Sequence, residues 1–293
     1  MNGAARQAVL IAGPTASGKS AMALKLARER DGIVVNADSM QVYDVLNVLT
    51  ARPGADELAQ APHRLYGFVP PDERFSTGRY VEAVSDLLAN VTAGRTLIFV
   101  GGTGLYFEAL TKGFTEAPKI DPAIVGKWSA LVAGLDAAGR AALLERHDPE
   151  FAGKLKVADP QRVVRALSVK EATGRSLAGW QTDTQPALLR DFTLERIVLD
   201  PDRDDLRARI RRRFEKMLEI GAVEEVRALL DLNLDPKLPA MKAIGVREIA
   251  SWQFGGIGRE EAVERAVIAS AQYAKRQRTW FRHHMQDWGW RKT

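Results

Sequence analysis

The sequence predicts an α/β fold, in which a parallel sheet is flanked by helices and carries a mostly helical insertion. Short apolar runs alternate with helical patterns through the first third of the 293-residue chain, which is typical of βαβ units. Each of the first three runs ends in a polar or glycine-rich turn. Ligands of open α/β sheets bind at the carboxyl ends of the strands, so we expect these turns to meet in one crevice.

The first expected strand, residues 8–12, leads directly into the sequence GPTASGKS at residues 13–20. Its spacing matches the phosphate-binding loop G-x-x-x-x-G-K-[ST], and a helix is expected from Lys19 to about residue 30. Backbone N–H groups of such a loop point at phosphate oxygens, Lys19 adds positive charge, and the Ser20 hydroxyl can ligate Mg²⁺. The sheet is therefore expected to resemble that of P-loop nucleoside triphosphatases.

Two more strands are expected at residues 32–37 and 96–100, with a helix at 79–91 before the second of them. The first is followed by Asp38, which fits a Mg²⁺ ligand through water, a base that faces the substrate, or a turn or helix N-cap residue. The second runs into Gly101-Gly102-Thr103-Gly104, whereas nucleotide hydrolysis calls for an acidic residue there to hold Mg²⁺. The loop alone therefore leaves the reaction open.

The hydrophobic pattern of the sequence changes between residues 112 and 190, where short helical patterns are broken by Asp-Pro and Gly. We expect a mostly helical insertion domain over this range, and a core domain formed by residues 1–111 and 191–293. The second core segment is expected to contain a strand at 194–199, a helix at 204–220 with an apolar stripe, and a long helix from about 259 to 284.

Composition excludes several classes of protein. The chain has no cysteine, which excludes disulfides, thiolate metal sites and a cysteine nucleophile. The 42 Lys and Arg against 37 Asp and Glu give a net charge of +5, which is too mild to identify a partner. Neither a signal peptide nor an apolar run of about 20 residues is present, so we expect a cytoplasmic protein without membrane association.

Positive charge is concentrated in three segments. Arg209 and Arg213 share one face of the expected helix, which fits either a solvated surface or a pair that approaches an anion. The segment QYAKRQRTWFR at 272–282 interleaves basic and aromatic side chains, as expected for nucleic-acid binding or for a helix that packs its aromatic residues inward. Residues 161–165 form the third segment, with Arg162 and Arg165 three positions apart. Because this segment and 272–282 lie in different expected domains, the two favour an extended polyanion.

In combination these motifs resemble the tRNA dimethylallyltransferase family, whose members prenylate an adenine beside the anticodon. Leu49 stands where the family commonly has glycine, and Val246 stands where it commonly has tyrosine. The matching segments run in the family's order and are GPTASGKS (13–20), NADSMQVY (36–43), PHRLYGFVPPDERFS (62–76), FVGGTGLY (99–106), DPQRVVRAL (159–167), RIRRRFEKMLEIGAVEEV (209–226), PAMKAIGVRE (239–248) and YAKRQRTWFR (273–282).

The resemblance implies that the loop holds the diphosphate of dimethylallyl diphosphate, which departs with Mg²⁺ near Ser20. It assigns catalytic roles to Asp38, as the base for the adenine N6, and to Thr103, Lys19 and Arg213. It also implies an anticodon stem-loop as partner, and we expect a monomer. The implied diphosphate contacts are Gly13, Pro14, Thr15, Ala16, Ser17, Gly18, Lys19, Ser20, Arg213 and, more weakly, Arg209. The implied tRNA contacts are Asp38, Ser39, Met40, Gln41, Thr103, Gln161, Arg162, Val163, Val164, Arg165, Lys242, Arg247, Lys275, Arg276, Arg278 and Arg282.

Two other classes of protein share part of this pattern. A small-molecule or nucleotide kinase has a similar strand, loop, lysine and helical lid, but it would consume ATP and has no need of a basic C-terminal helix. A nucleic-acid-binding protein switched by nucleotide would need a sensor for the γ-phosphate, and no obvious one is present in the sequence.

Overall fold

The computed structural model describes residues 6–92, 94–115, 118–182 and 185–293. It divides the chain into two compact units. The core unit comprises Met1–Thr111 and Leu188–Thr293, and the insertion unit comprises Lys112–Ala187. The division lies three residues before the boundary expected at residue 190.

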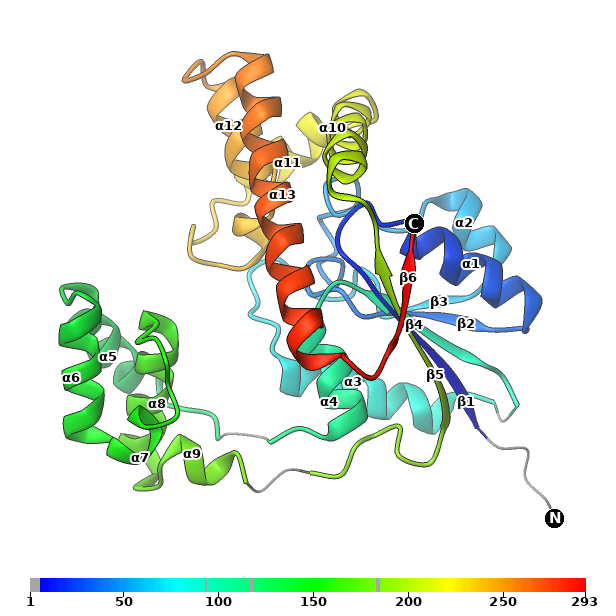
Figure 1. The fold of residues 1–293 in the computed structure, drawn as a ribbon. Helices are drawn as coiled ribbons and strands as arrows, with labels where there is room; N and C mark the ends of the chain where they lie inside the picture. The colour runs from blue at the N-terminus through cyan, green and yellow to red at the C-terminus, as the bar shows by residue number, and fades with distance from the viewer. Residues whose placement is uncertain (1–5, 93, 116–117, 183–184) are drawn as a thin grey trace. The chain divides into compact units, whose positions relative to one another are not determined.

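The core unit contains a six-stranded sheet in the order β3-β2-β4-β1-β5-β6, in which every pairing is parallel (Figure 1). This confirms the predicted α/β fold. In the register, Ala12 of β1 lies beside Gly101 of β4, so these two strands end at the same edge. The strands are β1 (Gln7–Ala12), β2 (Ile33–Asn36), β3 (His63–Arg64), β4 (Leu97–Gly101), β5 (Thr193–Asp200) and β6 (Gly289–Lys292).

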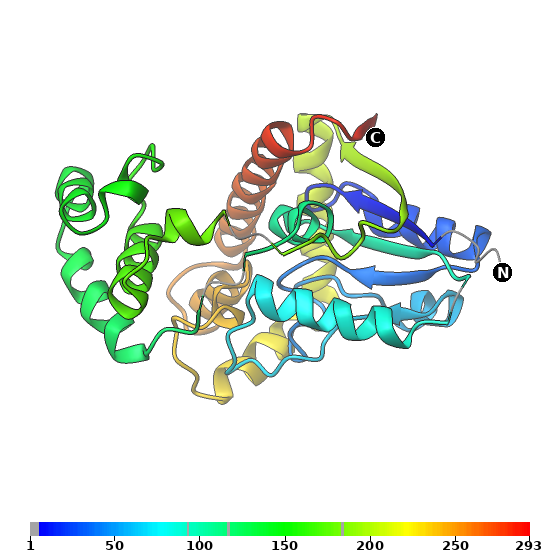
Figure 2. The same cartoon turned by 90° about the horizontal axis from the view of Figure 1, so that it is seen from below.

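Helices cover both faces of this sheet, because side chains of successive strand residues point to opposite faces. Val9 and Ile11 of β1 pack with α1 (Lys19–Glu29), near α2 (Ala55–Gln60). The alternate residues of β1 pack with α3 (Thr77–Asn90) and α4 (Gly104–Lys112) on the other face (Figures 1 and 2). Helix α3 begins two residues before the expected position because Ser76 accepts a hydrogen bond from the Arg79 N–H.

A helical layer adjoins the sheet through α13 (Arg259–His284) (Figure 1). The upper part of α13 packs against α10 and α12, whereas Phe281 near its end packs into the core beside the sheet. The predicted stripe of α10 is buried in the helical layer. The remaining elements of the layer are α10 (Arg203–Glu219), α11 (Ala222–Asp231), the 3₁₀ turn η1 (Ala240–Lys242) and α12 (Val246–Gln253).

The insertion unit is helical, as its sequence predicts. Its core is built from Trp128, Leu144, Phe151 and Val163. The Asp-Pro steps that break the sequence pattern start helices here, with Asp as N-cap and Pro in the first turn. Its helices are α5 (Pro122–Ala133), α6 (Ala137–His147), α7 (Pro149–Ala152), α8 (Pro160–Thr173) and α9 (Leu177–Trp180). Across the described ranges of both units, no helix is long and apolar enough to cross a membrane.

Candidate active site

The glycine-rich loop forms a tight turn between β1 and α1. Ala16 and Gly18 adopt left-handed backbone conformations with φ of 59° and 85°, and a Cβ on Gly13 would lie 2.7 Å from Ser17 Oγ. Helix α1 begins at Lys19, and no side chain caps its first N–H groups. The positive end of the helix dipole and these N–H groups are therefore suited to an anion, as the predicted phosphate-binding loop requires.

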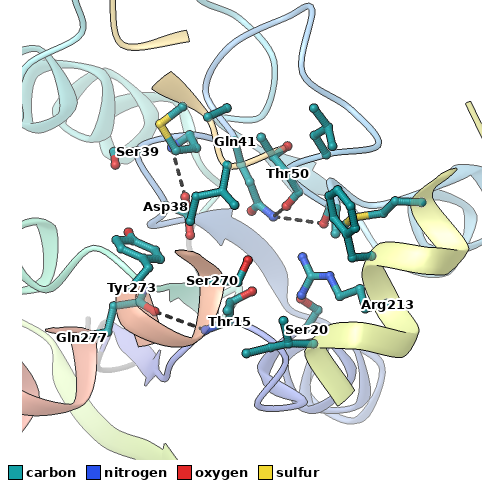
Figure 3. Close-up of a pocket in the computed structure, with 18 of the residues that line it drawn as sticks. Thr15, Ser20, Asp38, Ser39, Gln41, Thr50, Arg213, Ser270, Tyr273 and Gln277 are labelled. Carbon is teal, nitrogen blue, oxygen red and sulfur yellow. Dashed lines mark hydrogen bonds between the residues drawn. The ribbon is translucent and has the colours of Figure 1, made fainter. Parts of the chain in front are cut away.

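A cavity of about 400 Å³ lies beside this loop, within the core unit (Figure 3). Its size suits a small substrate. The loop supplies one wall, the segment after β2 and the loop at 49–51 a second, α10 a third, and η1 and α13 the remainder. The lining residues are Thr15, Lys19, Ser20, Asp38, Ser39, Met40, Gln41, Leu49, Thr50, Ala51, Ile210, Arg213, Phe214, Met217, Lys242, Ala243, Ile244, Ser270, Tyr273, Arg276 and Gln277.

Two cations that line this cavity, Lys19 and Arg213, are partly buried and have no acidic partner at ion-pair distance in the described part of the chain. Burial lowers the pKa of Lys19 to about 8, Asp38 opposes that shift, and Arg213 adds to it. Burial likewise lowers the pKa of Arg213, and Asp38 again opposes the shift. By contrast, Arg207 and Arg211 on the same helix pair with Glu264. Desolvated cations without a paired anion are costly, so this wall of the cavity favours an anionic ligand.

Asp38 lies at the carboxyl end of β2 and lines the same cavity. Its Oδ1 accepts a hydrogen bond from Met40 N at 3.0 Å, and its own N–H donates to Asn36 Oδ1 at 2.8 Å. Among the described residues no donor is hydrogen-bonded to its other oxygen, Oδ2. The structure therefore shows the turn role through Oδ1, while the carboxylate also faces the cavity.

Thr103 follows β4 and contacts the Asp38 segment. Its Oγ1 accepts a hydrogen bond from Ser39 N at 2.9 Å and donates one to Ser39 Oγ at 3.2 Å. Gly101 is required before it, because a Cβ there would overlap the carbonyl of Ala37. Thr103 is not among the described residues that line the cavity. In this structure Thr103 therefore positions the Asp38 segment, and its implied catalytic role stays a prediction.

The loop that bears Leu49 is held by a carboxylate from α11. Glu225 accepts hydrogen bonds from the backbone N–H groups of Asn47, Val48 and Leu49 at 2.7, 2.6 and 2.9 Å. Leu49 causes no backbone strain, since its φ lies outside the left-handed region. Its side chain instead covers Gly245, where a Cβ would lie 2.7 Å from Leu49 Cδ2. The departure from the family's glycine therefore fills the cavity wall.

Gln41 holds the next two residues of the same loop. Its Nε2 donates to the carbonyls of Thr50 and Ala51 at 2.9 and 3.0 Å (Figure 3). Gln41 is one of the implied tRNA contacts, and in this structure its amide nitrogen is used within the protein. Lys242 and Arg276 also line the cavity, whereas Arg209 is half-buried on α10 and does not contribute to the described lining.

Sequence reasoning missed Gln277, which lies on α13. Its Oε1 accepts a hydrogen bond from Thr15 N at 3.2 Å, and its Nε2 donates to Gly102 O at 2.9 Å. The signal in the sequence is the polar series Ser270, Tyr273 and Gln277 at i, i+3 and i+7, because polar residues on the packed stripe of a helix need partners. All three line the cavity.

The basic face predicted on α13 is only partly a free surface. Lys275, Arg276 and Arg282 are exposed. Arg278 is 11% exposed and forms an ion pair with Asp200 at 2.7 Å, and Arg282 approaches the same carboxylate at 3.7 Å. The expected phosphate contact of Arg278 is corrected accordingly, because a buried, paired guanidinium is not available to RNA.

The predicted tRNA contacts of the insertion unit lie on α8. Gln161 and Arg162 are exposed, and burial lowers the pKa of Arg165. Val163 is 0% exposed and Val164 packs against the same hydrophobic cluster. The expectation that Val163 contacts tRNA is therefore wrong, because its side chain belongs to the core of the unit. Arg247 is exposed on α12 in the core unit.

The sheet and its loop define a P-loop protein. The residues that line the cavity indicate which kind of reaction such a protein catalyses. The turn after β4 supplies no acidic side chain, while a carboxylate faces two cations across from the loop. This is the arrangement of an enzyme that transfers a group from a phosphorylated donor to a nucleophile. The family model described as IPP transferase matches residues 41–284. The chain belongs to this family, the tRNA dimethylallyltransferases, and is an enzyme.

Similar proteins extend over almost the whole chain. A tRNA dimethylallyltransferase of Chelativorans sp. is 54% identical over 283 residues, which cover 96% of this chain and 97% of that protein. One from Mesorhizobium japonicum is 51% identical, with 97% of this chain and 88% of the relative covered. These relatives decide against the kinase and the nucleotide switch.

Solved structures agree with the fold. A full-length tRNA isopentenylpyrophosphate transferase of Bacillus halodurans has a TM-score of 0.68 and 31% identity, with 98% of this chain and 90% of that chain covered. A eukaryotic dimethylallyltransferase, described as acting on tRNA, has a TM-score of 0.79 and 26% identity, with 94% and 70% covered.

Proposed function

We propose that this enzyme transfers a dimethylallyl group from dimethylallyl diphosphate to the exocyclic N6 of an adenine next to the anticodon in tRNA, and releases diphosphate. The observation that carries the proposal is the pair of uncompensated cations, Lys19 and Arg213, on the same cavity as the Asp38 carboxylate. An anionic leaving group and a proton acceptor are the two requirements of this transfer.

The leaving group is held on the loop side of the cavity. The N–H groups at the start of α1, with Lys19 and Arg213, surround the diphosphate, while Arg209 is left out because it lies off the cavity. As the allylic C–O bond breaks, its electron pair moves to the bridging oxygen. Cations already in place stabilise that charge without reorganisation. The loop residues from Gly13 to Ser20 are the proposed diphosphate contacts.

The nucleophile is activated on the Asp38 side. The N6 lone pair of adenine is delocalised into the ring, so the amine is weak until a base accepts one of its hydrogens. Asp38 accepts that proton as the C–N bond forms. Ser39 and Thr103 hold the Asp38 segment in place. An adenine cannot reach this carboxylate while stacked, so it must be turned out of the anticodon loop.

Mg²⁺ fits this cavity as a companion of the diphosphate. The Ser20 hydroxyl lines it beside Lys19, and the donors present are hard oxygens, which Mg²⁺ prefers. The described residues contain no cluster of three His, Asp or Glu side chains, so the substrate's oxygens and water must complete the coordination. When bound, Mg²⁺ neutralises charge on the departing diphosphate.

Both units contribute proposed contacts to tRNA. Phosphate contacts require exposed cations, which α12 and α13 provide in the core unit and α8 provides in the insertion unit. We expect the enzyme to act as a monomer, and a tRNA substrate supports action in the cytoplasm. The proposed contacts are Asp38, Ser39, Met40, Lys242 and Arg276 at the cavity, with Gln161, Arg162, Arg165, Arg247, Lys275 and Arg282 outside it.

The proposed function is tested with purified protein, Mg²⁺, dimethylallyl diphosphate and unmodified tRNA whose anticodon is followed by adenines. N6-prenylated adenosine should form without ATP, as measured by mass spectrometry of digested tRNA. Absence of this product, together with ATP turnover, would contradict the proposal.

Replacement of Asp38 separates its two roles. Asp38→Asn keeps an oxygen for the Met40 N–H but removes the proton acceptor, so the turnover number should fall by about 10²–10⁴. Binding of tRNA, followed by fluorescence anisotropy, should change by less than about threefold. A variant with nearly normal turnover would show that Asp38 only shapes the turn.

A further inference from the structure

We propose that Gln277 is a positioning residue that holds the diphosphate loop and the Asp38 segment at a fixed separation, so that the allylic carbon is captured by the adenine and not by water. The inference rests on the proposed function. Gln277 contacts neither reacting atom in the proposed transfer, and its neighbours on α13 are basic residues of the kind expected to bind tRNA.

Gln277 bridges two loops that are far apart in sequence. Its carboxamide oxygen is bonded to the N–H of Thr15 in the phosphate loop, and its carboxamide nitrogen is bonded to the carbonyl of Gly102 after β4 (Figure 3 shows the first bond). The side chain is 6% exposed. The bond to Gly102 is buried and the bond to Thr15 is partly buried beside the cavity, so the carboxamide is held at both of its ends.

The bridge continues from Gly102 to the carboxylate. Thr103, the next residue, accepts the Ser39 N–H and donates to the Ser39 hydroxyl. Ser39 follows Asp38 directly. The series Thr15, Gln277, Gly102, Thr103 and Ser39 thus joins the wall that holds the leaving group to the wall that holds the base.

Close packing fixes the position of the bridge. A Cβ on Gly102 would overlap Gln277 Nε2, so the backbone approaches the carboxamide as only glycine permits. One residue further along α13, Arg278 is paired with Asp200 at the end of β5, and both side chains are nearly buried. The helix is therefore anchored to the sheet at the same turn from which Gln277 reaches the two loops.

A fixed separation matters because the reaction passes through an electron-poor allylic carbon. If the amine is displaced when the C–O bond breaks, water can attack instead. In that side reaction the C–O electron pair leaves with the diphosphate, a C–O bond forms to the water oxygen, and the proton of water is released to solvent. The products are dimethylallyl alcohol and diphosphate. Alignment of the reacting atoms normally suppresses such losses.

The test is the ratio of dimethylallyl alcohol to prenylated adenosine, measured per turnover in the presence of saturating tRNA. Gln277→Leu removes both bonds, and with them a hydrogen bond to the neighbouring Tyr273, and should raise this ratio at least tenfold over the wild type. Prenyl transfer should slow by about 10–100-fold, while the donor KM and the tRNA Kd change by less than about threefold. The ratio does not depend on how much protein is folded, so a purely structural role leaves it unchanged.

A second variant keeps the test informative if Gln277→Leu does not fold. Gln277→Glu can make both bonds when its carboxyl is protonated, but its ionised form faces the Gly102 carbonyl and lies near Asp38. The alcohol ratio of this variant should be high at pH 8 and fall toward the wild-type value at pH 6. Gln60→Leu, an exposed glutamine replaced on α2, serves as the matched control and should keep the wild-type ratio.

The outcomes are distinguishable. If the wild type forms no prenylated adenosine, the proposed function fails. If the wild type prenylates tRNA, but Gln277→Leu and Gln277→Glu keep its alcohol ratio at every pH, the proposed role of Gln277 is overturned. A raised ratio in the leucine variant, or a pH-dependent ratio in the glutamate variant, supports it.

Discussion

Lys19 shows how a single residue acquires its chemistry from its surroundings. Its ammonium donates to the carbonyl of Pro14 at 3.2 Å, and burial lowers its pKa to about 8 despite the nearby Asp38. An ordinary lysine has a pKa near 10.4. In the ligand-free protein Lys19 is thus close to losing its charge at mildly alkaline pH, whereas a bound diphosphate favours the charged form.

This shift predicts that donor binding depends on pH. Because the pKa of Lys19 is about 8 without ligand and is raised by diphosphate, binding takes up a proton above pH 8. Affinity for dimethylallyl diphosphate should therefore be level between about pH 7 and 7.5 and decline above pH 8, by up to tenfold per pH unit. Calorimetric titration at fixed Mg²⁺, without tRNA, measures it.

Arginine provides the control for that titration. Lys19→Arg stays charged throughout this range, so its affinity should be lower overall but independent of pH between 8 and 9. The assignment to Lys19 is contradicted if both proteins show the same decline.

At the scale of the elements, the cavity depends on contacts between elements that are remote in sequence. The loop at 47–49 has no regular structure of its own, and the Glu225 carboxylate at the start of α11 binds three of its N–H groups. Carboxylates that accept several backbone hydrogen bonds are strongly held. Helix α11 therefore shapes the cavity wall without itself lining it.

Removal of this carboxylate should loosen that wall. Glu225→Ala leaves the N–H groups of Asn47, Val48 and Leu49 without their acceptor and should lower the free energy of unfolding by about 2 kcal/mol. The donor KM should rise severalfold. Glu224→Ala, on the same turn but exposed, should change neither quantity. Equal effects of the two substitutions on urea unfolding and on KM would show that the contact is dispensable.

Periodicity in the sequence predicts the elements much better than the contacts between them. Local patterns predict the apolar stripe of α10 and the apolar strands β1, β2, β4 and β5. Burial repeats every 3.6 residues in a helix and every two residues in a strand. Strand β6 could not be found in this way, because it has four residues and is mostly exposed. The loop and Asp38 could be predicted because each follows a strand end. The bond between Thr15 and Gln277 spans 262 positions, and no local pattern encodes such a pairing.

The same limit explains the error at Arg278. The spacing of Lys275, Arg278 and Arg282 predicts one basic face, and the helix does bring the three residues together. The sequence does not show that β5 ends in Asp200 directly beside this helix. Long-range pairing turns the central arginine into a structural anchor and leaves the flanking cations for a polyanion.

At the scale of the whole molecule, the two units have different proposed tasks. The cavity is formed entirely by the core unit, and the insertion unit has its own hydrophobic core. Exposed cations that suit tRNA occur on both, whereas the proposed groups for the donor occur on one. Binding of tRNA and binding of the donor should therefore be separable by mutation.

One substitution in each unit tests this separation. Arg162→Ala on α8 and Lys275→Ala on α13 should each weaken tRNA binding and reduce the slope of log K against log salt by about 1, with the double variant close to additive. Affinity for dimethylallyl diphosphate should stay unchanged, because neither residue lines the cavity. Lys127→Ala is the control in the insertion unit, since Glu171 already neutralises that lysine at 2.9 Å. A slope that responds to Lys275 but not to Arg162 would restrict tRNA recognition to the core unit, because loss of a phosphate contact must appear as fewer released counterions.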